Sequence, residues 1–433
     1  MSELGVVAEL PWWAWGLMVI GLLALIGVIG ALFLPDWPTP DYRLGFDADP
    51  GSEDFLRLAA GFLNVPLLRG GTAELLQNGD RFYPAMLEAI RGAQRSINFE
   101  VYIFESDGTG REFIEAFKER ARAGVEVRLL LDAFGSWKLK RAHRRDLVEA
   151  GVRLELFRPL ALRNLVRIYR RTHRRAIVID GRIGFTGGAA ISDKWKGDTR
   201  TPKEWRDSMT RVTGALVVGV QSAFASNWVY NCGEFIAGPG FYPPLRVDEG
   251  PACGVSVVSS PSDAQQPIRM LLWLSFVNAR RRLWIASSYF IPDLQLRKAV
   301  TERARSGVDV RILVPGNHTD AIPVQYTGRG YYEELLEAGV RIFEYQASMM
   351  HAKTVVVDDG WTLVGSANMD ERSMEINEEN LLGIAEPELA RSAAEGMDQD
   401  FARSREIELE AWRRRPLHQR VLEKAAKVLI EQY

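Results

Sequence analysis

The sequence has very little cysteine and no excess of charge of one sign. Its 433 residues include only Cys232 and Cys253, too few for a disulfide scaffold or a four-ligand zinc site, so we interpret both as ordinary thiols. The 54 Lys and Arg residues nearly balance the 56 Asp and Glu residues, which disfavours binding to nucleic acid through a global positive charge. Apolar (47%) and charged (25%) residues occur at globular levels, which excludes wholesale disorder and a polytopic membrane protein. At roughly 150 residues per domain, the length predicts two or three folded units.

One run of the chain lacks charge altogether. Residues 10–35 contain no charged side chain, and about 20 residues suffice for a helix to cross the hydrocarbon core. Tryptophans at 12, 13, 15 and 37 flank this run, as is typical at the interface of lipid and water. The run predicts one transmembrane helix. A cleaved signal peptide or a buried helix is the alternative, disfavoured because the tail at 1–9 has no Lys or Arg.

The segment after this run predicts how the body is attached. Arg43 is the only nearby basic residue, so the positive-inside rule gives little guidance. We expect a single pass in the inner, cytoplasmic membrane, with the N-terminus outside and the body in the cytoplasm. Residues 36–66 are predicted as a tether, extended where Pro38, Pro40 and Pro50 occur.

Three blocks of sequence occur twice in the same order, and a duplication of this kind sets the architecture. The pairs are 119–131 (ERARAGVEVRLLL) with 302–314 (ERARSGVDVRILV), 147–157 (LVEAGVRLELF) with 335–345 (LLEAGVRIFEY), and 173–187 (HRRAIVIDGRIGFTG) with 351–365 (HAKTVVVDDGWTLVG). We therefore predict two copies of one fold, at 67–245 and 246–433, the second with a C-terminal helical tail. Two independent domains that share no site are the alternative.

Each copy alternates helical and strand patterns. The amphipathic stretch 110–123 ends at Gly124 and runs into the apolar segment 125–132, which is typical of a helix followed by a buried strand. Such alternation predicts an α/β fold with a central sheet in each copy.

Two of the five histidines, His173 and His351, occupy equivalent positions in the repeats. Alternation along a strand places Lys353 on the same face as His351, and Arg175 on the same face as His173. Two imidazoles and two cations can stabilise the charge on a phosphodiester. One imidazole can attack phosphorus while the other protonates the leaving alkoxide. We expect neither a metal nor a cofactor, because the motifs bring no clustered carboxylates or further histidines.

These motifs resemble the phospholipase D superfamily, and within it the bacterial cardiolipin synthases. The second motif reads HAKTVVVDDGWTLVGSAN, a histidine, lysine, aspartate, glycine, serine and asparagine at fixed spacing, and the first keeps this spacing. The resemblance covers about residues 68–415. It implies two tandem α/β-sandwich repeats that form one pseudo-twofold body.

The resemblance also implies roles for individual residues. His173 would be the nucleophile that forms a phosphohistidine, and His351 the general acid and base. Asp207 and Glu379 match the acidic residues that hydrogen-bond the two histidines. The other residues that the motifs match are Arg175 and Lys353 as catalytic cations, Gly188, Ser366 and Asn368 as substrate-binding residues, and Asp180 and Asp358 as structural motif aspartates.

The first motif departs from the family pattern at two positions. Arg175 replaces a lysine, which keeps the charge but exchanges a compact ammonium for a planar fork. Ala190 replaces an asparagine and cannot donate, and losing one oxyanion donor can cost about 10²-fold to 10³-fold in rate. A degraded first half is therefore an alternative. Against it, His173, Asp180 and Asp207, an expected carboxylate partner of a histidine, all remain.

Basic clusters occur beside aromatic residues. In a membrane-tethered body they predict contact with anionic headgroups, at about 1 kcal/mol per residue near the surface. Solvated surface side chains are the alternative. The clusters are Lys138, Lys140, Arg141, Arg144 and Arg145 beside Trp137; Arg163, Arg167, Arg170, Arg171, Arg174 and Arg175; and Arg413, Arg414 and Arg415 after Trp412.

Together these patterns predict a phosphatidyltransferase that makes cardiolipin from phosphatidylglycerol. Its expected partners are phospholipids in a membrane, not nucleic acid, and one chain suffices for a composite site. Phospholipase D-type hydrolysis, with water as acceptor, is one alternative, and a lipid-binding scaffold without turnover is another. A nuclease fits poorly with the near-zero net charge.

Overall fold

The computed structural model describes residues 11–32, 41–159, 169–245, 249–261 and 266–430. The predicted tail at 1–9 and two arginines of the second basic cluster, Arg163 and Arg167, lie outside the described residues. The chain divides into two compact units. One comprises Met1–Arg43 and Val428–Tyr433, and the other Leu44–Lys427.

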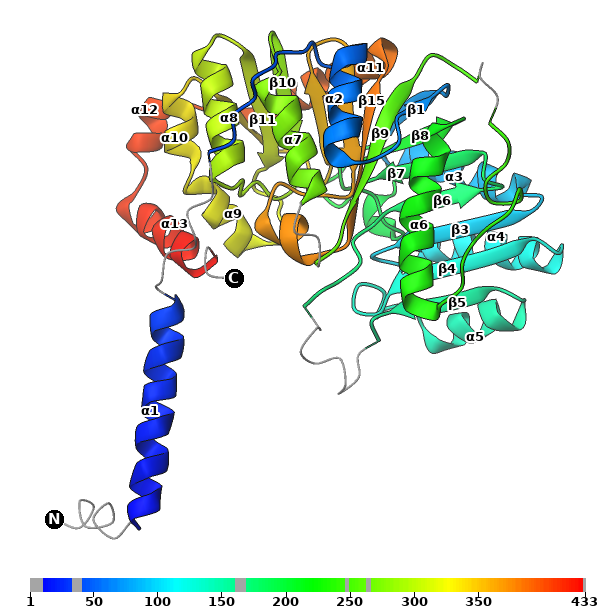
Figure 1. Cartoon of the computed structure of the whole chain (residues 1–433), viewed down its shortest axis with the longest axis horizontal. Coiled ribbons are helices and arrows are strands. Elements are labelled where there is room, and N and C mark those ends of the chain that lie inside the picture. Colours follow the sequence, from blue (N-terminus) through cyan, green and yellow to red (C-terminus); the bar gives the residue numbers. More distant parts are fainter. Residues whose placement is uncertain (1–10, 33–40, 160–168, 246–248, 262–265, 431–433) are drawn as a thin grey trace. The chain divides into compact units, whose positions relative to one another are not determined.

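The smaller unit contains helix α1 (Trp12–Leu32) (Figure 1). Within the part of the chain that the structure describes, no helix is both long and apolar enough to cross a membrane. The predicted transmembrane helix at 10–35 is therefore not confirmed.

The larger unit contains two mixed sheets (Figure 1). The seven-stranded sheet has the order β2 (Ala73–Gln77), β8 (Ser208–Thr213), β7 (Ile183–Gly187), β6 (Ala176–Ile179), β3 (Ser96–Val101), β4 (Glu126–Asp132) and β5 (Arg153–Phe157). The nine-stranded sheet has the order β1 (Leu68–Arg69), β9 (Cys253–Ser259), β15 (Glu379–Ala385), β14 (Trp361–Gly365), β13 (Thr354–Val357), β10 (Arg282–Ala286), β11 (Asp309–Pro315), β12 (Arg341–Tyr345) and β16 (Ser404–Ile407).

The two sheets repeat one topology. In each, three neighbouring strands run parallel, β3–β4–β5 in the first and β10–β11–β12 in the second. An antiparallel meander then leads outward, β3–β6–β7–β8 in the first sheet and β10–β13–β14–β15 in the second. The duplicated sequence blocks thus fold into duplicated sheets, as predicted.

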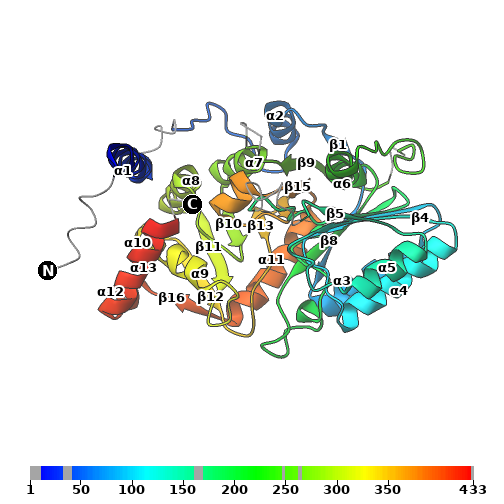
Figure 2. The ribbon, with the colours of Figure 1, turned by 90° about the horizontal axis from the view of Figure 1, so that it is seen from below.

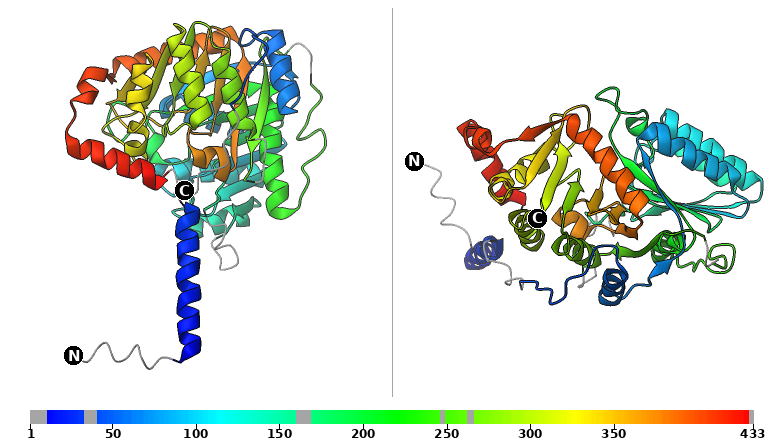
Figure 3. Two further views of the ribbon diagram at one scale, coloured as in Figure 1. Left: turned by 60° about the vertical axis from the view of Figure 1, so that its left-hand side comes forward. Right: turned by 90° about the horizontal axis from the view of Figure 1, so that it is seen from above.

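Helices form the outer layers and a central layer of the larger unit (Figure 2). On the first sheet the outer helices are α3 (Gly79–Gly92), α4 (Gly108–Arg122) and α5 (Arg141–Glu149), and on the second α7 (Pro267–Val277), α8 (Leu294–Arg305) and α10 (Tyr332–Glu337). Two helices, α6 (Leu216–Cys232) and α11 (Pro387–Ala402), contact strands of both sheets (Figure 3). The remaining helices are α9 (Ile322–Arg329), α12 (Leu409–Arg413) and α13 (Leu417–Ile430).

The turn from helix to buried strand depends on a glycine in each repeat. Gly124 follows α4 and Gly307 follows α8, with φ of 90° and 92°. Side chains disfavour this left-handed region, whereas glycine enters it without steric cost. The duplicated block at 119–131 and 302–314 therefore encodes the same sharp turn into β4 and β11.

The predicted tether at 36–66 contains a helix in its second half, after the part where prolines predicted an extended chain. Residues 53–63 form helix α2 (Glu53–Leu63), capped by the hydroxyl of Ser52, which accepts a hydrogen bond from the backbone N–H of Phe55. Phe55 and Leu56 on its apolar face are buried, and the helix contacts α7 and β9. The apolar residues along 55–63 form one face of the helix, and burial of this face attaches the segment to the larger unit.

The repeats share a core, so the alternative of two independent domains is wrong. One buried apolar cluster joins Val178 and Val220 of the first repeat to Val364 and Leu382 of the second. Arg206 of the first repeat also forms a buried ion pair with Asp400 of the second, at 2.9 Å. Breaking such a pair from one side would cost roughly 3–5 kcal/mol.

Candidate active site

The two motif histidines are fixed by main-chain hydrogen bonds that cross between the repeats. The backbone N–H of His173, just before β6, donates to the carbonyl of Glu378 at 2.8 Å. The backbone N–H of His351, just before β13, donates to the carbonyl of Arg206 at 2.7 Å. Each acceptor immediately precedes one of the predicted carboxylates. The pseudo-twofold arrangement thus places each histidine against the acidic residue of the opposite half.

The side chains pair in the same crossed way. His173 Nδ1 lies 3.1 Å from Glu379 Oε2, and His351 Nδ1 lies 2.7 Å from Asp207 Oδ2. Both carboxylates are fully buried. The sequence left open which histidine each carboxylate serves. Asp207 reaches His351 because Arg206, just before it, bridges to Met350, just before His351. With each Nδ1–H donating to a carboxylate, each Nε2 is the nitrogen left to face a substrate, and Lys353 Nζ lies beside that of His351.

Different neighbours hold the two carboxylates. Glu379 accepts hydrogen bonds from the hydroxyls of Ser366 (2.5 Å) and Ser373 (3.0 Å). Asp207 accepts from the indole N–H of Trp195 at 2.8 Å. Ser366, predicted to bind substrate, is buried and occupied by this support. Gly188, at the equivalent position, leaves room for Asp207, since a Cβ there would lie 2.2 Å from Asp207 Oδ1.

Both predicted cations are buried beside the histidines. Lys353 Nζ donates to Ser288 Oγ at 2.6 Å and lies 3.3 Å from His351 Nε2. The guanidinium of Arg175 donates to the carbonyl of His173. Its Nε is buried and has no partner among the described residues.

Burial and like charge set the protonation of the site. Burial, with Arg175 as the next cause, lowers the pKa of His173 to about 4. Burial and then Lys353 lower the pKa of His351 to about 4. Burial lowers the pKa of Lys353 to about 7. At neutral pH both imidazoles are therefore uncharged, so the nucleophile needs no deprotonation, and positive charge comes from Arg175 and from the protonated fraction of Lys353.

Asn368 of the second motif and Ala190, which stands at the equivalent position of the first, have different surroundings. Asn368 is buried, and its Oδ1 has no hydrogen-bond partner in the described ranges. Ala190 is fully buried, and its carbonyl accepts from the hydroxyl of Tyr83 at 2.7 Å. The first repeat thus fills this position with packing and a tyrosine hydrogen bond.

The motif aspartates hold the turns behind the site. Asp180 accepts from the backbone N–H groups of Gln94, Arg95 and Ser96, at the start of β3. Asp358 accepts equivalently from residues 280–282, at the start of β10. Both aspartates adopt positive φ, 54° and 52°, which short polar side chains tolerate. They tie the hairpin after each motif to the neighbouring strand and do not contact either histidine.

Sequence reasoning missed three aromatic side chains at the site. The Tyr102 ring centre lies 5.1 Å from that of His173, and those of Trp195 and Trp205 lie 5.3 Å and 5.4 Å from that of His351. Tyr102 directly follows the buried strand β3, and Trp205 lies two residues before Asp207. Their positions beside a buried strand and beside Asp207 were the features of the sequence that could have identified these rings. The rings limit rotation of both imidazoles.

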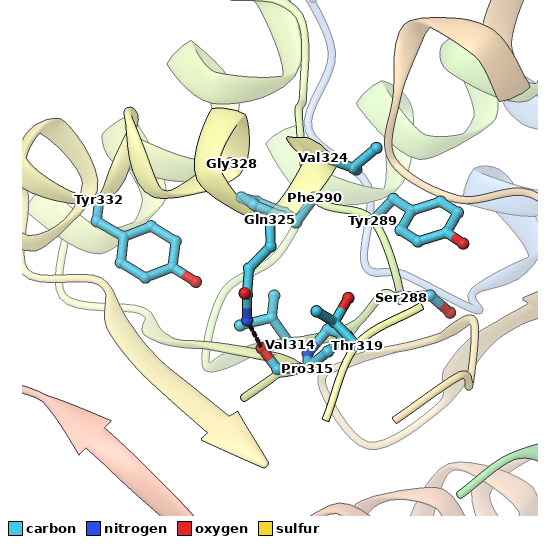
Figure 4. A pocket seen from close by; sticks show the side chains of 10 residues that line it. All are labelled: Ser288, Tyr289, Phe290, Val314, Pro315, Thr319, Val324, Gln325, Gly328 and Tyr332. Carbon is cyan, nitrogen blue, oxygen red and sulfur yellow. Dashed lines mark hydrogen bonds between the residues drawn. The ribbon is translucent and has the colours of Figure 1, made fainter. Parts of the chain in front are cut away.

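A small cavity is lined in part by Ser288, the residue that accepts the hydrogen bond of Lys353 (Figure 4). It is bounded by Ser288, Val314 and Tyr332, and Gln325 reaches across it to the carbonyl of Pro315 at 3.2 Å. Its volume of about 20 Å³ is enough for a water molecule and too small for a lipid headgroup. This cavity therefore does not hold the lipid headgroup.

Two neutral imidazoles aimed by carboxylates, with a cation beside each, can attack phosphorus on one side and move a proton on the other. The fold and site thus define a two-motif enzyme of phosphodiester transfer. A family model described as cardiolipin synthase, PLD-like domain, matches residues 86–195 and 275–401, one stretch in each repeat. The chain belongs to this family.

Individual relatives agree with this assignment. The cardiolipin synthase of Geobacillus kaustophilus is 35% identical over 382 residues, which cover 88% of this chain and 76% of that protein. The cardiolipin synthase of Halalkalibacterium halodurans is 35% identical over 375 residues, covering 86% and 74%. Among solved structures, the phosphatidylserine synthase of Haemophilus influenzae superposes with a TM-score of 0.67 at 16% identity, covering 88% of this chain and 100% of that one. That likeness supports the fold.

Proposed function

We propose that this phosphatidyltransferase makes cardiolipin from two molecules of phosphatidylglycerol through a phosphohistidine. The observation that carries the proposal is the crossed pairing of His173 with Glu379 and of His351 with Asp207. It gives one free Nε2 on each side of a common site, as a two-step transfer requires. Membership of the cardiolipin synthase family supports the choice of product.

In the first step, His173 Nε2 attacks the phosphorus of phosphatidylglycerol. The bond from phosphorus to the glycerol headgroup oxygen breaks, and His351 gives its Nε2 proton to that oxygen, so that free glycerol leaves. Glu379 accepts the Nδ1 proton of His173 as a hydrogen bond and stabilises the positive charge that develops on the imidazole. Arg175 and Lys353 stabilise the charge on the phosphoryl oxygens.

In the second step, the headgroup hydroxyl of another phosphatidylglycerol takes the place of glycerol. His351 Nε2 removes the hydroxyl proton, the oxygen attacks phosphorus, and the bond between phosphorus and His173 breaks. The products are cardiolipin and the starting enzyme. The same residue donates a proton in one step and accepts it in the other, as microscopic reversibility requires.

The first step needs His351 in its protonated form, although its pKa lies near 4 in the empty site. An arriving phosphodiester brings a negative charge, which favours the imidazolium and raises this pKa. His351 takes this proton up from solvent as the substrate binds, so that Lys353, 3.3 Å from His351 Nε2, keeps its charge for the phosphoryl oxygens.

We extend the proposal to the cellular setting. The uncharged run at 10–35 and the lipid substrates support a single-pass protein of the cytoplasmic membrane with its body on the cytoplasmic side. One chain supplies both histidines and both carboxylates, so a monomer suffices for one composite site. Protease accessibility in sealed vesicles tests the topology. Activity of the chain diluted below any dimerisation constant tests the monomer.

The test of the reaction is lipid analysis after incubating purified protein with phosphatidylglycerol in micelles. The proposal expects cardiolipin and glycerol in equal amounts from the wild type, neither product from His173→Ala, and strongly reduced amounts of both from His351→Ala. Phosphatidic acid without cardiolipin would replace transfer by hydrolysis. No product from any phospholipid, with lipid binding retained, would favour the scaffold, the reading motivated by Arg175 and Ala190.

A further inference from the structure

A loop beside the nucleophile exposes two large aromatic side chains. In the β4–α5 loop (residues 133–140), Phe134 is 53% exposed and Trp137 is 66% exposed. Exposing two such rings to water is unfavourable, and a cluster of them on a loop marks a contact surface. Nothing in the proposed chemistry uses either ring.

Hydrogen bonds fix the base of this loop next to His173. Asp132, at the end of β4, accepts from the backbone N–H groups of Phe134 and Gly135, each at 2.9 Å, and from that of Thr172 at 3.1 Å. Thr172 immediately precedes the nucleophile. The hydroxyl of Ser136 donates to the carbonyl of Tyr102 at 3.0 Å, and the Tyr102 ring packs on His173. The loop is therefore a rigid neighbour of the active site.

The chain around the two rings is basic. Between positions 137 and 149 there are five basic and two acidic side chains. Lys138 pairs with Glu105 at 3.0 Å, whereas Lys140 and Arg141 are exposed and form no ion pair within the described ranges. This positive charge beside apolar rings is complementary to a surface of anionic headgroups over hydrocarbon.

The second repeat offers an internal comparison. The backbone N–H of Ala133 donates to the carbonyl of Phe157, and that of Gly316 donates equivalently to Tyr345, so the two loops begin at the same place. Counting from there, Asn317 stands at the position of Phe134 and Asp320 at that of Trp137. The equivalent loop is thus polar and carries an acid. Of these two loops, only the one beside the nucleophile carries exposed Phe and Trp rings and a cluster of Lys and Arg.

We propose that the β4–α5 loop docks on an anionic bilayer, with Phe134 and Trp137 inserted at the level of the headgroups. The docking rests on the proposed function, because it names the surface from which His173 receives its lipid. Trp and Phe favour this interfacial depth, and Lys140 and Arg141 meet the headgroups around them. A phosphodiester in the docked leaflet then has a short path to the nucleophile.

The first experiment places a polarity-sensitive fluorophore on the loop of the full chain in proteoliposomes. In a Cys232→Ser, Cys253→Ser background, Phe134→Cys carries the label, and Phe62→Cys is the matched control, because Phe62 on α2 is similarly exposed at 60%. We expect a blue shift at position 134 that grows with the phosphatidylglycerol fraction over phosphatidylcholine and shrinks with salt. No shift at 134 beyond that at 62 would overturn the proposal.

The second experiment compares substrates. Phe134→Ser with Trp137→Ser should lower cardiolipin formation from phosphatidylglycerol in vesicles by roughly 10-fold, since two rings lose their apolar burial. Formation from short-chain phosphatidylglycerol below its critical micelle concentration should stay unchanged, and Phe62→Ser should alter neither. Equal losses on both substrates would contradict docking. A wild type that makes no cardiolipin would refute the proposed function instead, and the fluorophore shift would still decide the docking.

Discussion

The two repeats support equivalent histidines with different residues. In the second repeat, Ser366 and Ser373 hold the longer carboxylate, Glu379. In the first, Gly188 stands at the position of Ser366, and the shorter Asp207 takes its hydrogen bond from Trp195. A side chain removed at one position is matched by a change at its neighbour. The comparison teaches that each half is a co-adapted set, so single exchanges between halves should fail.

The two cations, Arg175 and Lys353, are likewise each matched to a neighbouring side chain. Lys353 is held by the small hydroxyl of Ser288. The bridges Phe104–Ile191 and Phe290–Met369 align the halves so that Tyr102 stands at the position of Ser288. The first half therefore combines Arg175 with Tyr102, and the second combines Lys353 with Ser288. The arginine that departs from the family pattern belongs to such a set, and it keeps a charge at every accessible pH.

The largest effect should separate the roles of the histidines. His173→Ala removes the nucleophile and should abolish both cardiolipin formation and any covalent intermediate. His351→Ala removes proton transfer and should lower the rate by about 10²-fold to 10⁴-fold. It should still form the phosphoenzyme from a phosphatidyl substrate with a good leaving group, since such a group needs no proton. Intact-protein mass spectrometry measures the adduct. An adduct in His173→Ala and none in His351→Ala would reverse the roles.

The next largest effect tests the crossed pairing. Glu379→Gln keeps the shape but removes the charge that stabilises an imidazolium at His173, so adduct formation should slow by about 10²-fold or more. Asp207→Asn should act on His351 and spare adduct formation from the substrate with a good leaving group. Single-turnover kinetics with that substrate distinguish the two variants. If Asp207→Asn slowed adduct formation and Glu379→Gln did not, each carboxylate would serve its own half.

The fold and the paired motifs could be predicted from the sequence, because the duplicated sequence blocks correspond to strands that occur in both repeats. The sequence did not predict that each histidine pairs with the carboxylate of the opposite half. Asp207 and His351 are 144 positions apart and meet through the bridge of Arg206 with Met350. The sequence also drew no distinction between Ser366 as a ligand for substrate and as a support for Glu379. That distinction depends on the position of the Ser366 hydroxyl, which lies 2.5 Å from Glu379 Oε2. The spacing of residues along the sequence does not give such a distance.

A smaller effect should follow from copying the second half into the first. Gly188→Ser reproduces Ser366, but its Cβ would lie 2.2 Å from Asp207 Oδ1, so the carboxylate must move away from His351. A displacement of about 1 Å at such a site can cost roughly 10²-fold in rate. Ser366→Ala, the matched change in the other half, leaves Ser373 on Glu379 and should cost less than 10-fold. Steady-state rates of both variants measure the difference. A harmless Gly188→Ser would disprove the co-adaptation.

The smallest change in rate should come from Lys353→Arg, and its signature is the pH profile. The pKa of Lys353 lies near 7, so its charge is present below that pH and lost above it, and kcat/KM of the wild type should fall as the pH rises through 7. On the acidic side the limit is protonation of His173 near pH 4. Arginine stays protonated, so the variant should lose about 10-fold at pH 6 because its fork cannot fit against Ser288, yet lack the decline near 7. The ratio of variant to wild-type kcat/KM should therefore rise with pH. If kcat/KM of the variant also fell near pH 7, the fall in the wild type would be caused by another group. Buried Glu100, whose pKa is raised by burial to about 7, would be the next residue to test.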